Sequence, residues 1–530
     1  MVSSAHPLAS AIGLEIMKKG GNAIDSAIAT HFALSVVYPQ AGNIGGGGFA
    51  VIRLDDGTIA SLDFREKAPG LADRDMYLDA NGRLNSKQWS THGNLASGVP
   101  GAVDGMFQLH DKFGSLPMSE LIQPSIDLAK NCYTLTALAA DILNINQDEF
   151  QQQNRWSIPH LSDEPWQKGD TIQQPELART LTRIQLQGRR GFYEGKTADQ
   201  IVAEMKSGNG IITHSDLKNY KSIWRKPIIG HYRGHQIISM GPPSSGGIAL
   251  MQLLRGTANY PIANWGHNSA KTIHLMTELE RRVYADRATY LGDPDFVDIP
   301  IEQLLDSVYN QQRYDGISFD KATPSAVVSA GEIPPKESPE TTHLSVVDDQ
   351  GNAVSITTTL NSSFGSKVMV QGAGFFLNNE MDDFSSKPGS PNLYGLIGGE
   401  ANAIAPNKRM LSSMTPTIVT YNDKLKMVLG TPGGSTIITS VYQTLLNVID
   451  HGMGMQEAVN AKRVHHQWYP DEIRLETDAL SNSTQAQLEA LGHQLRMTDK
   501  IGRMNCILVL PDGRLEGGAD PRGDNTALGY

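Results

Sequence analysis

Two threonines stand where their hydroxyl groups can act together. Residues 343–347 and 353–360 each have the alternating pattern of a strand, and a turn separates them. If that turn is centred on Gln350, Thr341 lies directly opposite Thr359. Opposed residues in an antiparallel pair have Cβ atoms about 4.5–5.5 Å apart, close enough for two hydroxyl groups to share a hydrogen bond. The pair is therefore a candidate for nucleophilic chemistry in which one hydroxyl orients the other.

This inference depends on the register of the hairpin. A shift of one residue would place Leu360 opposite Thr341, because neighbouring side chains in a strand point to opposite faces. Threonine is also favoured in strands for ordinary packing reasons. On the hairpin alone, two strand threonines without a chemical role remain the favoured interpretation.

A glycine pair in the last third of the chain is a second candidate feature. The strand predicted at 424–430 leads into Thr431-Pro432-Gly433-Gly434-Ser435, and a helix is predicted from about residue 436. Glycines at a helix N-terminus leave backbone N–H groups unobstructed, and such groups can stabilise a developing negative charge in an oxyanion hole. Considered locally, a simple helix start explains Gly433 and Gly434 equally well.

Carboxylates and further hydroxyl groups gather in the same third of the chain. Three carboxylates, those of Glu380, Asp382 and Asp383, fall within four residues. Like charges this close repel one another, so they either lie in a solvated loop or face a cation. Ser412 and Ser413 follow after a long loop. Nothing in the local pattern proves that these groups meet in the folded chain.

The composition excludes several classes of protein. The chain has 530 residues, with 45 Lys and Arg against 56 Asp and Glu, a formal net charge of −11 and 39% hydrophobic residues. This length predicts a large buried core, and the acidic balance without a basic run argues against nucleic-acid binding. The two cysteines, Cys132 and Cys506, form neither a disulfide framework nor a CxxC metal motif. The apolar stretches are too short for a membrane helix, and the start lacks the pattern of a secretory signal.

The elements that must position these groups divide into a helical part and a β-rich part. A helix is predicted at about 23–37, and residues 100–310 are mostly helical. Residues 341–530 are β-rich, with helices at about 436–449 and 483–491. The candidate hydroxyl groups, carboxylates and glycine pair all belong to the β-rich part.

A glycine run at 45–48 separates the helix at 23–37 from a strand at 49–53. Phosphate-binding loops lead from a strand into a helix and continue with Gly-Lys-Ser/Thr, so a nucleotide site is not indicated. We expect instead that another backbone segment packs closely against this run.

A change of composition precedes the hairpin. Pro324, Pro334, Pro335 and Pro339 occur in a polar stretch at about 319–340. Such a stretch predicts an exposed, extended connection between the helical and the β-rich parts.

Ten short segments, in this order, closely resemble the γ-glutamyltransferase (γ-glutamyltranspeptidase, glutathione hydrolase) family. They are SSAHPLASAIGLEIMKKGGNAIDSAIA, GNIGGGGF, LDFREKAP, PPSSGGI, TTHLSVVDDQGNAVSITTTLN, LNNEMDDFS, PNKRMLSSMTPTIV, GTPGGS, HHQWYPDEIR and ADPRGD. Each segment alone is a weak signal, whereas ten in register are a specific one. The resemblance covers essentially the whole chain.

The resemblance implies an α+β fold of the N-terminal-nucleophile hydrolase type, a four-layer αββα sandwich with additional helices mostly from the N-terminal part. It also implies a proenzyme that cleaves itself between Glu340 and Thr341. The products would be a large subunit, residues 1–340, ending in the exposed Pro-rich tail at about 319–340, and a small catalytic subunit, residues 341–530. The two subunits would form one structural unit, a heterodimer.

Cleavage would explain the choice of a threonine. A free α-amine has a pKa of about 7.7–8.0, so much of it is available as a base near neutral pH. Thr341 would then hold the nucleophile and the base within one residue. A Ser-His-Asp triad is not required, and we interpret His343 as a supporting strand residue.

By resemblance, the candidate residues take the following roles. Thr341 would form a γ-glutamyl ester, Thr359 would orient its hydroxyl, and the N–H groups of Gly433 and Gly434 would stabilise the oxyanion. The other implied roles are binding of the substrate α-carboxylate by Arg65 with Ser412 and Ser413, binding of its α-ammonium by Asn361, Glu380 and Asp383, and a lid loop at about 383–412 that includes Tyr394. Arginine suits the first role because its planar guanidinium can bind a carboxylate in two places.

The implied activity is cleavage of γ-glutamyl amides such as glutathione, with transfer of the acyl group to water or to an amino-acid or dipeptide acceptor. No metal and no organic cofactor are implied, and the family places the protein in the periplasm or outside the cell. One alternative is a glutaryl-type cephalosporin acylase of the same fold, whose substrate lacks the α-amino group that Glu380 and Asp383 would hold. The other is a γ-glutamyl-binding protein that never matures, against which Thr341 and Thr359 argue.

Overall fold

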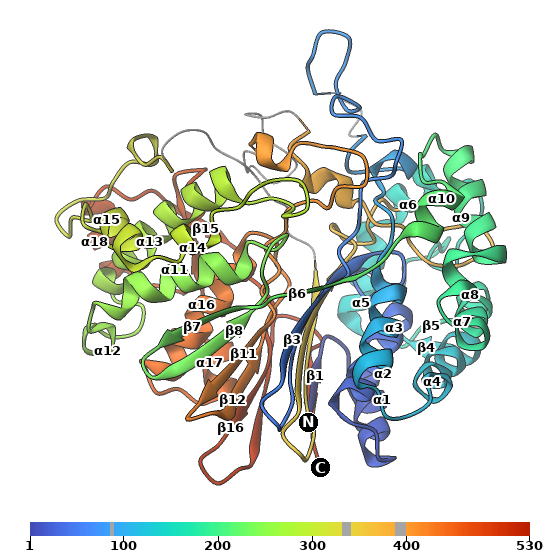
Figure 1. The fold of residues 1–530 in the computed structure, drawn as a ribbon, viewed down its shortest axis with the longest axis horizontal. Coiled ribbons are helices and arrows are strands. Elements are labelled where there is room, and N and C mark those ends of the chain that lie inside the picture. The colour runs from blue at the N-terminus through green and yellow to red at the C-terminus, as the bar shows by residue number, and fades with distance from the viewer. Residues whose placement is uncertain (85–88, 331–340, 387–398) are drawn as a thin grey trace.

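The computed structural model describes residues 1–84, 89–330, 341–386 and 399–530. Two β-sheets face each other at its centre, and helices cover the outer face of each sheet (Figure 1). This arrangement confirms the expected α+β class and the αββα layers. Within the described ranges, no helix combines the length and the apolar character that crossing a bilayer requires.

The first sheet has seven strands, in the order β18-β1-β9-β10-β2-β3-β6. Their bounds are β1 Val2–Ser4, β2 Gly47–Arg53, β3 Ile59–Asp63, β6 Ile223–Arg225, β9 Thr342–Val347, β10 Ala353–Thr359 and β18 Thr526–Leu528. The strands from the two ends of the chain, β1 and β18, lie side by side in this sheet, and β1 pairs with β9. β1 and β18 have three residues each, which is too short for an alternating pattern, and neither strand was predicted.

The second sheet has six strands, in the order β17-β16-β12-β11-β8-β7. Their bounds are β7 Ile228–Tyr232, β8 His235–Ser239, β11 Thr417–Tyr421, β12 Lys424–Leu429, β16 Asn505–Val509 and β17 Leu515–Ala519. Two small sheets are formed by β13 Val464–His465, β14 Ile473–Glu476 and β15 Leu495–Thr498, and by β4 Tyr133–Thr134 and β5 Thr171–Ile172.

The helices fall into two groups, one on each side of the paired sheets (Figure 1). The group on the first sheet's side is α1 Pro7–Lys18, α2 Ala23–Val37, α3 Ala102–Phe113, α4 Met118–Asn131, α5 Ala137–Ile145, α6 Gln147–Gln153, α7 Pro175–Gln187, α8 Arg190–Tyr193, α9 Gly195–Ser207 and α10 His214–Asn219. The group on the second sheet's side is α11 Gly246–Ala258, α12 Ile262–Trp265, α13 Ala270–Tyr290, α14 Ile301–Leu304, α15 Ser307–Tyr314, α16 Thr436–Ile449, α17 Met455–Asn460 and α18 Asn482–Ala490.

Strand β2 shows how one strand serves two hydrophobic cores. Phe49 and Val51 belong to the core that includes the second sheet, whereas Ala50 and Ile52 belong to the core that includes α1 and α2. Successive side chains of a strand point to opposite faces, so a strand buried on both faces is apolar at nearly every position. All seven residues of β2 are buried.

The hairpin of β9 and β10 has the predicted register. Val347 pairs with Ala353 at the turn, and Thr342 pairs with Thr358 at the other end. The next position in this register places Thr341 opposite Thr359. The Asp348 carboxylate stabilises the turn by accepting hydrogen bonds from backbone N–H groups within it.

The first part of the Pro-rich stretch is less exposed than expected. Ser325 is buried, its N–H donates to the Asp471 carboxylate at 2.7 Å, and the Trp468 indole N–H donates to the carbonyls of Ser325 and Val328. These tertiary hydrogen bonds attach residues 319–330 to the body of the protein, and composition alone gave no sign of them. Residues 331–340 lie outside the described part of the chain.

Candidate active site

One small cavity lies at the end of the β9–β10 hairpin that is opposite its turn, and residues far apart in the sequence line it. The lining residues are Arg65, Thr341, Thr359, Asn361, Glu380, Asp383, Ser412, Ser413, Met414, Gly434 and Ile437. All of them except Met414 and Ile437 were candidates from the sequence. The volume is about 10 Å³, which is room for about one water molecule, so the side chains nearly fill the space between them. The candidates Glu340 and Tyr394 lie outside the described residues.

The two threonines are held at the end of the hairpin. Thr341 is only 3% exposed and Thr359 only 2%. The Thr359 hydroxyl oxygen accepts a hydrogen bond of 2.7 Å from the Asn361 N–H. Asn361 has a φ of +73°, in the left-handed region where asparagine is favoured over most residues. This backbone turn therefore orients the Thr359 hydroxyl.

The glycine run before β2 brings a second backbone against Thr359. A Cβ atom built at Gly46 would lie 2.0 Å from the carbonyl oxygen of Thr359, and one at Gly48 would lie 2.2 Å from that of Thr357. Any side chain at these positions would push β10 away. The expectation of close backbone packing is confirmed, and the run serves the site by fixing the position of Thr359.

The glycine pair before α16 presents an N–H group to the cavity. Gly433 and Gly434 have φ values of +138° and +56°, which favour glycine. The Gly433 carbonyl accepts hydrogen bonds from the N–H and the hydroxyl of Thr436, in the first turn of α16. Because the peptide unit is planar and trans, the Gly434 N–H points away from that helix. Gly434 also lines the cavity, so this donor is available for an oxyanion.

Arg65 is the cation that the acidic cluster faces. Its guanidinium donates to the carboxylates of Glu380 and Asp383, and it also donates to the Leu411 carbonyl at 3.1 Å. The side chain is 1% exposed. Of the two predicted placements, a solvated loop or contact with a cation, the second is correct for Glu380 and Asp383, whereas the Asp382 carboxylate accepts a hydrogen bond from the Ser90 hydroxyl. The groups expected to bind opposite ends of a zwitterion thus contact each other directly.

Glu66 is a further carboxyl group in this charge cluster. It lies 3.6 Å from the Arg65 guanidinium, and its negative charge acts on the carboxyl group of Glu380. Burial raises the pKa of Glu66 to about 7, against the opposing effect of the Arg65 charge. Burial also raises the pKa of Glu380 well above its usual range. With both pKa values raised, one proton held at either of these two carboxyl groups lets one arginine compensate three buried acids.

The Asn378 side chain fixes the backbone of the acidic turn, Glu380–Asp383, which is a short 3₁₀ helix. The Asn378 side chain accepts from the Glu380 N–H at 3.1 Å and donates to the carbonyls of Gly45 and Gly98. The same side chain therefore connects the acidic turn to the glycine run. All four residues of the turn are buried, so the protein interior and not the solvent surrounds them.

Ser412 is supported by the PPSSGG segment at 242–247. The Ser412 carbonyl accepts from both the N–H and the hydroxyl of Ser245, each at 2.7 Å, and the Arg287 guanidinium donates to the same Ser245 hydroxyl at 2.8 Å. From the sequence this segment was interpreted as a helix start, which the beginning of α11 at Gly246 confirms. The segment also holds the backbone of Ser412 in place, which was not predicted.

His343 lies outside the cavity. Its ring nitrogens make hydrogen bonds with the hydroxyl groups of Thr357 and Ser345, at 2.9 and 3.1 Å. Burial lowers the pKa of His343 to about 3, so the ring is neutral at physiological pH. These contacts are those of a supporting strand residue.

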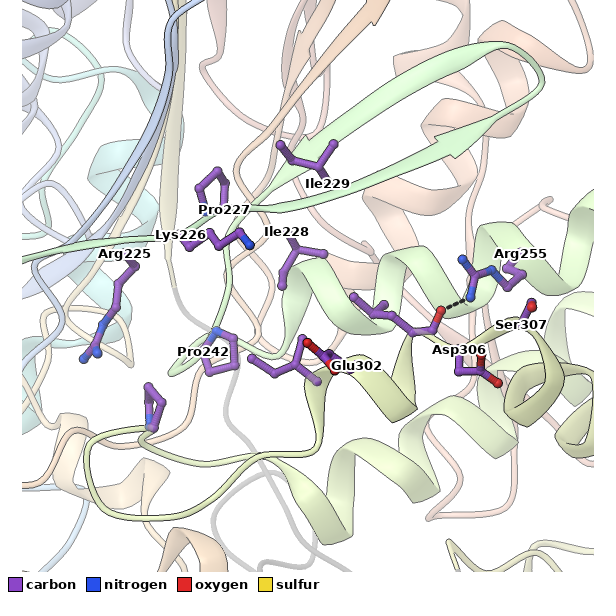
Figure 2. Close-up of a pocket in the computed structure, with 13 residues that line it drawn as sticks. Arg225, Lys226, Pro227, Ile228, Ile229, Pro242, Arg255, Glu302, Asp306 and Ser307 are labelled. Atoms are coloured by element: carbon purple, nitrogen blue, oxygen red, sulfur yellow. Dashed lines mark hydrogen bonds between the residues drawn. The ribbon is translucent and has the colours of Figure 1, made fainter.

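Two other features of the described residues lie apart from this site. His274, Glu278 and His493 form a group that could surround a metal ion, but the two rings hydrogen-bond to each other at 2.7 Å and Glu278 accepts from Arg282. These contacts account for the three side chains without a metal. A separate cavity has a volume of about 890 Å³, and its lining, which includes Arg225, Pro242 and Glu302 (Figure 2), contains none of the candidate residues.

Sequence reasoning missed the supporting residues Glu66, Asn378 and Ser245. Glu66 lies directly beside the candidate Arg65 and Asn378 lies two residues before the candidate Glu380, and that proximity was the only available signal. Ser245 lies 167 residues from Ser412, and no local pattern connects the two.

Comparisons with known proteins identify the family of this chain. The model of the gamma-glutamyltranspeptidase family matches residues 9–530. Glutathione hydrolase proenzymes of Escherichia coli K12 and Pseudomonas sp. A14 are 46% and 47% identical, each over 100% of this chain and over 92% and 94% of their own lengths. The crystal structure of a cephalosporin acylase from Bacillus halodurans superposes with a TM-score of 0.86 at 27% identity, covering 100% of this chain and 96% of that one. The chain belongs to the gamma-glutamyltranspeptidase family.

Proposed function

We propose that the protein is a self-cleaving enzyme that hydrolyses γ-glutamyl amides such as glutathione and transfers the γ-glutamyl group to amino acids or dipeptides. One observation carries this proposal. The hydroxyl-bearing Thr341 and Thr359 line the same cavity as a buried cation, Arg65, and two buried carboxylates, Glu380 and Asp383. A substrate head group with one α-ammonium and one α-carboxylate matches these charges, and its side-chain carbonyl then lies toward the hydroxyl groups.

Maturation uses the same nucleophile. The Thr341 hydroxyl attacks the carbonyl carbon of Glu340, the C–N bond breaks, and an ester forms while the α-amine is released. Water then hydrolyses the ester, giving subunits of residues 1–340 and 341–530. They stay associated as a heterodimer, because β9 in the small subunit remains hydrogen-bonded to β1 in the large one.

In turnover, the new α-amine takes the proton of the Thr341 hydroxyl as the oxygen attacks the γ-carbonyl carbon. The N–H groups of Gly433 and Gly434 stabilise the oxyanion. Collapse gives the γ-glutamyl ester, and the amine passes its proton to the leaving nitrogen. Water or the amine of an acceptor then attacks the ester, which releases glutamate or a new γ-glutamyl amide and restores Thr341.

Substrate binding exchanges ion pairs. The substrate α-ammonium replaces the Arg65 guanidinium beside Glu380 and Asp383. The substrate α-carboxylate then forms an ion pair with the Arg65 guanidinium. Each buried charge therefore keeps a partner throughout, which avoids the large penalty of an unpaired buried ion. Ser412, Ser413 and Asn361 add polar contacts at the edge of the exchange.

The decisive experiment is N-terminal sequencing of the smaller band on a denaturing gel, combined with an assay on a γ-glutamyl anilide. We expect a start at Thr-Thr-His-Leu, no cleavage and no turnover for Thr341→Ala, and reduced activity for Thr341→Ser, which keeps the hydroxyl and the amine. Thr342→Ala is the matched control, since it removes the neighbouring hydroxyl. Full turnover by an uncleaved chain would disprove the mechanism.

A substrate panel separates this activity from that of an acylase. A glutaryl anilide lacks the α-ammonium, so it would leave Glu380 and Asp383 without a substrate cation, and we expect it to react more slowly than the γ-glutamyl anilide. The opposite order would favour a glutaryl acylase. The family resemblance also places the mature enzyme in the periplasm or outside the cell, which fractionation of the native host tests.

A further inference from the structure

A second cavity begins at the same glycine turn as the Thr341 cavity. Its volume is about 350 Å³, within the range of about 300–1,000 Å³ that is usual for ligand pockets. Its lining includes Gly433, Thr436, Arg474, Lys500, Arg503 and Arg522. Four of these side chains are cationic, and none of the residues found to line this cavity is acidic, although the whole chain has a net charge of −11.

Arg522 is not the group that calls for a ligand. Its guanidinium donates to the Glu476 carboxylate at 2.6 Å and to the Asp520 carboxylate at 3.0 Å. Two buried acids thus compensate its charge, and we assign it a structural role.

Arg474 is compensated less well. It pairs in register with Arg496 on the adjacent parallel strand, so two like charges lie side by side. Both arginines share one carboxylate, that of Glu472, at 3.5 Å from Arg474 and at 3.0 Å from Arg496. Burial and the Arg496 charge both lower the pKa of Arg474. An additional anion at this point would stabilise the guanidinium.

Lys500 adds a second charge of the same sign. Its ammonium donates to the backbone carbonyl of Arg522 at 3.0 Å, a neutral acceptor that leaves the positive charge in place. The N-terminus of α16, at Thr436, also faces this cavity and contributes a smaller positive potential. The cavity as a whole therefore favours a small anion.

The position of the cavity indicates which anion. The carbonyl carbon of an amide substrate bears both the oxygen that the glycine turn stabilises and the nitrogen of the leaving group. The leaving group therefore starts beside Gly433 and Gly434. When it is an amino acid or a peptide, it ends in a carboxylate.

We infer that this second cavity binds the terminal carboxylate of the leaving peptide, and that of the acceptor which replaces it, with Arg474 and Lys500 as cationic anchors. The inference rests on the proposed γ-glutamyl activity. Arg474 offers the planar fork that suits a carboxylate, and Lys500 offers a point charge.

The test compares glutathione with its C-terminal carboxamide, which has nearly the same shape but no terminal charge. For the unsubstituted protein we expect kcat/KM to be at least about tenfold higher for glutathione than for the carboxamide. A factor of this size is what one hydrogen bond to a charged group contributes to binding. Arg474→Gln and Lys500→Gln should each reduce this ratio severalfold, the double variant should bring it close to one, and Arg474→Lys should give an intermediate ratio. A variant that was merely destabilised would lower both rates and leave the ratio unchanged.

Arg514→Gln is the matched control, because it removes the same charge from an exposed arginine that pairs with Asp512 and does not line the cavity. Its ratio should equal that of the unsubstituted protein. Equal rates on both substrates, or a loss in Arg514→Gln as large as that in Arg474→Gln, would overturn the carboxylate site. A γ-glutamyl anilide, whose leaving group has no charge, separates the two proposals. Its hydrolysis together with a ratio of one rejects only this site, whereas no hydrolysis rejects the proposed function and this inference with it.

Discussion

At the scale of residues, the candidate site is a set of buried charges that compensate one another. Arg65 contacts Glu380 and Asp383 directly, and burial raises the pKa values of Glu66 and Glu380. A buried ion pair contributes little to stability by itself, but removing one partner is costly because the other remains uncompensated. The set is therefore better explained by recognition of a charged head group than by stability.

Arg65→Lys tests that recognition. Lysine keeps the charge but loses the planar fork and the donor to the Leu411 carbonyl. We expect KM for a γ-glutamyl anilide to rise by about ten- to a hundredfold, with a smaller change in kcat. Arg514→Lys, at an exposed arginine paired with Asp512, is the control. An unchanged KM would remove Arg65 from substrate binding.

Glu66→Gln tests whether the Glu66 carboxyl group holds a proton in the folded protein. The pKa of this carboxyl rises from a usual value of 4.5 to about 7 in the folded protein. Between these pH values the folded state holds a proton that the unfolded state releases, so the stabilisation is complete below pH 4.5 and is lost as the pH rises toward 7. Between pH 5 and pH 8 we expect the melting temperature of both proteins to fall. The fall should be smaller in Glu66→Gln than in the unsubstituted protein, and the difference between the two falls should be roughly 3 °C.

The control for that experiment is Glu15→Gln, which removes an exposed carboxyl from α1. Its pH profile should follow that of the unsubstituted protein. Identical profiles for Glu66→Gln and the unsubstituted protein would show that Glu66 is ionised in the fold across this pH range.

At the scale of elements, the site depends on backbones that approach each other closely. The run 45–48 has no side chains, so β10 and the backbone of Phe376 can lie against it. The Asn378 side chain then joins the run to the acidic turn. A strand end, a glycine run and a 3₁₀ helix are positioned together, and none of them holds the site alone.

Gly46→Ala tests this arrangement. The added methyl group would meet the Thr359 carbonyl oxygen at 2.0 Å, and backbone cannot move aside as a flexible side chain can. We expect a loss of about 1–3 kcal/mol in the free energy of unfolding and a fall in kcat of at least about tenfold, because Thr359 shifts. In Gly316→Ala the nearest atom to the new methyl group is at 4.0 Å, so both quantities should stay as they are. Normal turnover by Gly46→Ala would mean that the position of Thr359 is not critical.

At the scale of the whole molecule, the first and the last strand support the strand that follows the proposed nucleophile, Thr341. β1 lies between β18 and β9, with Val2 opposite Leu528 on one side and Val346 on the other. The Ser10 hydroxyl also donates to the Thr526 carbonyl at 2.8 Å. The first and the last strand thus complete the sheet that carries Thr341.

Removal of residues 526–530 should therefore weaken maturation as well as stability. β1 would become an edge strand with unpaired backbone groups, and β9 would lose the support behind it. We expect a lower melting temperature and a smaller cleaved fraction on a denaturing gel. Tyr530→Ala, at a residue that is 69% exposed, is the control. Complete cleavage in the truncated chain would show that β18 does not contribute to positioning Thr341.

The sequence by itself determined the local elements and the family. The register of the hairpin followed from one turn, and the bounds of α2 from its apolar run. These features depend on residues close together in the chain, so their periodicity and turn chemistry are visible without a structure. Ten motifs in order were enough to name the candidate residues.

Only the tertiary structure decided how these groups meet. Arg65 follows β3 and Glu380 follows β10, and these two strands of the first sheet bring together residues that are 315 positions apart in the chain. Tertiary packing also joins Ser245 to Ser412, buries Glu66 near Glu380, and brings four cationic side chains around one cavity next to Gly433. Such contacts arise from the close packing of segments far apart in the chain, and no local pattern of residues specifies them.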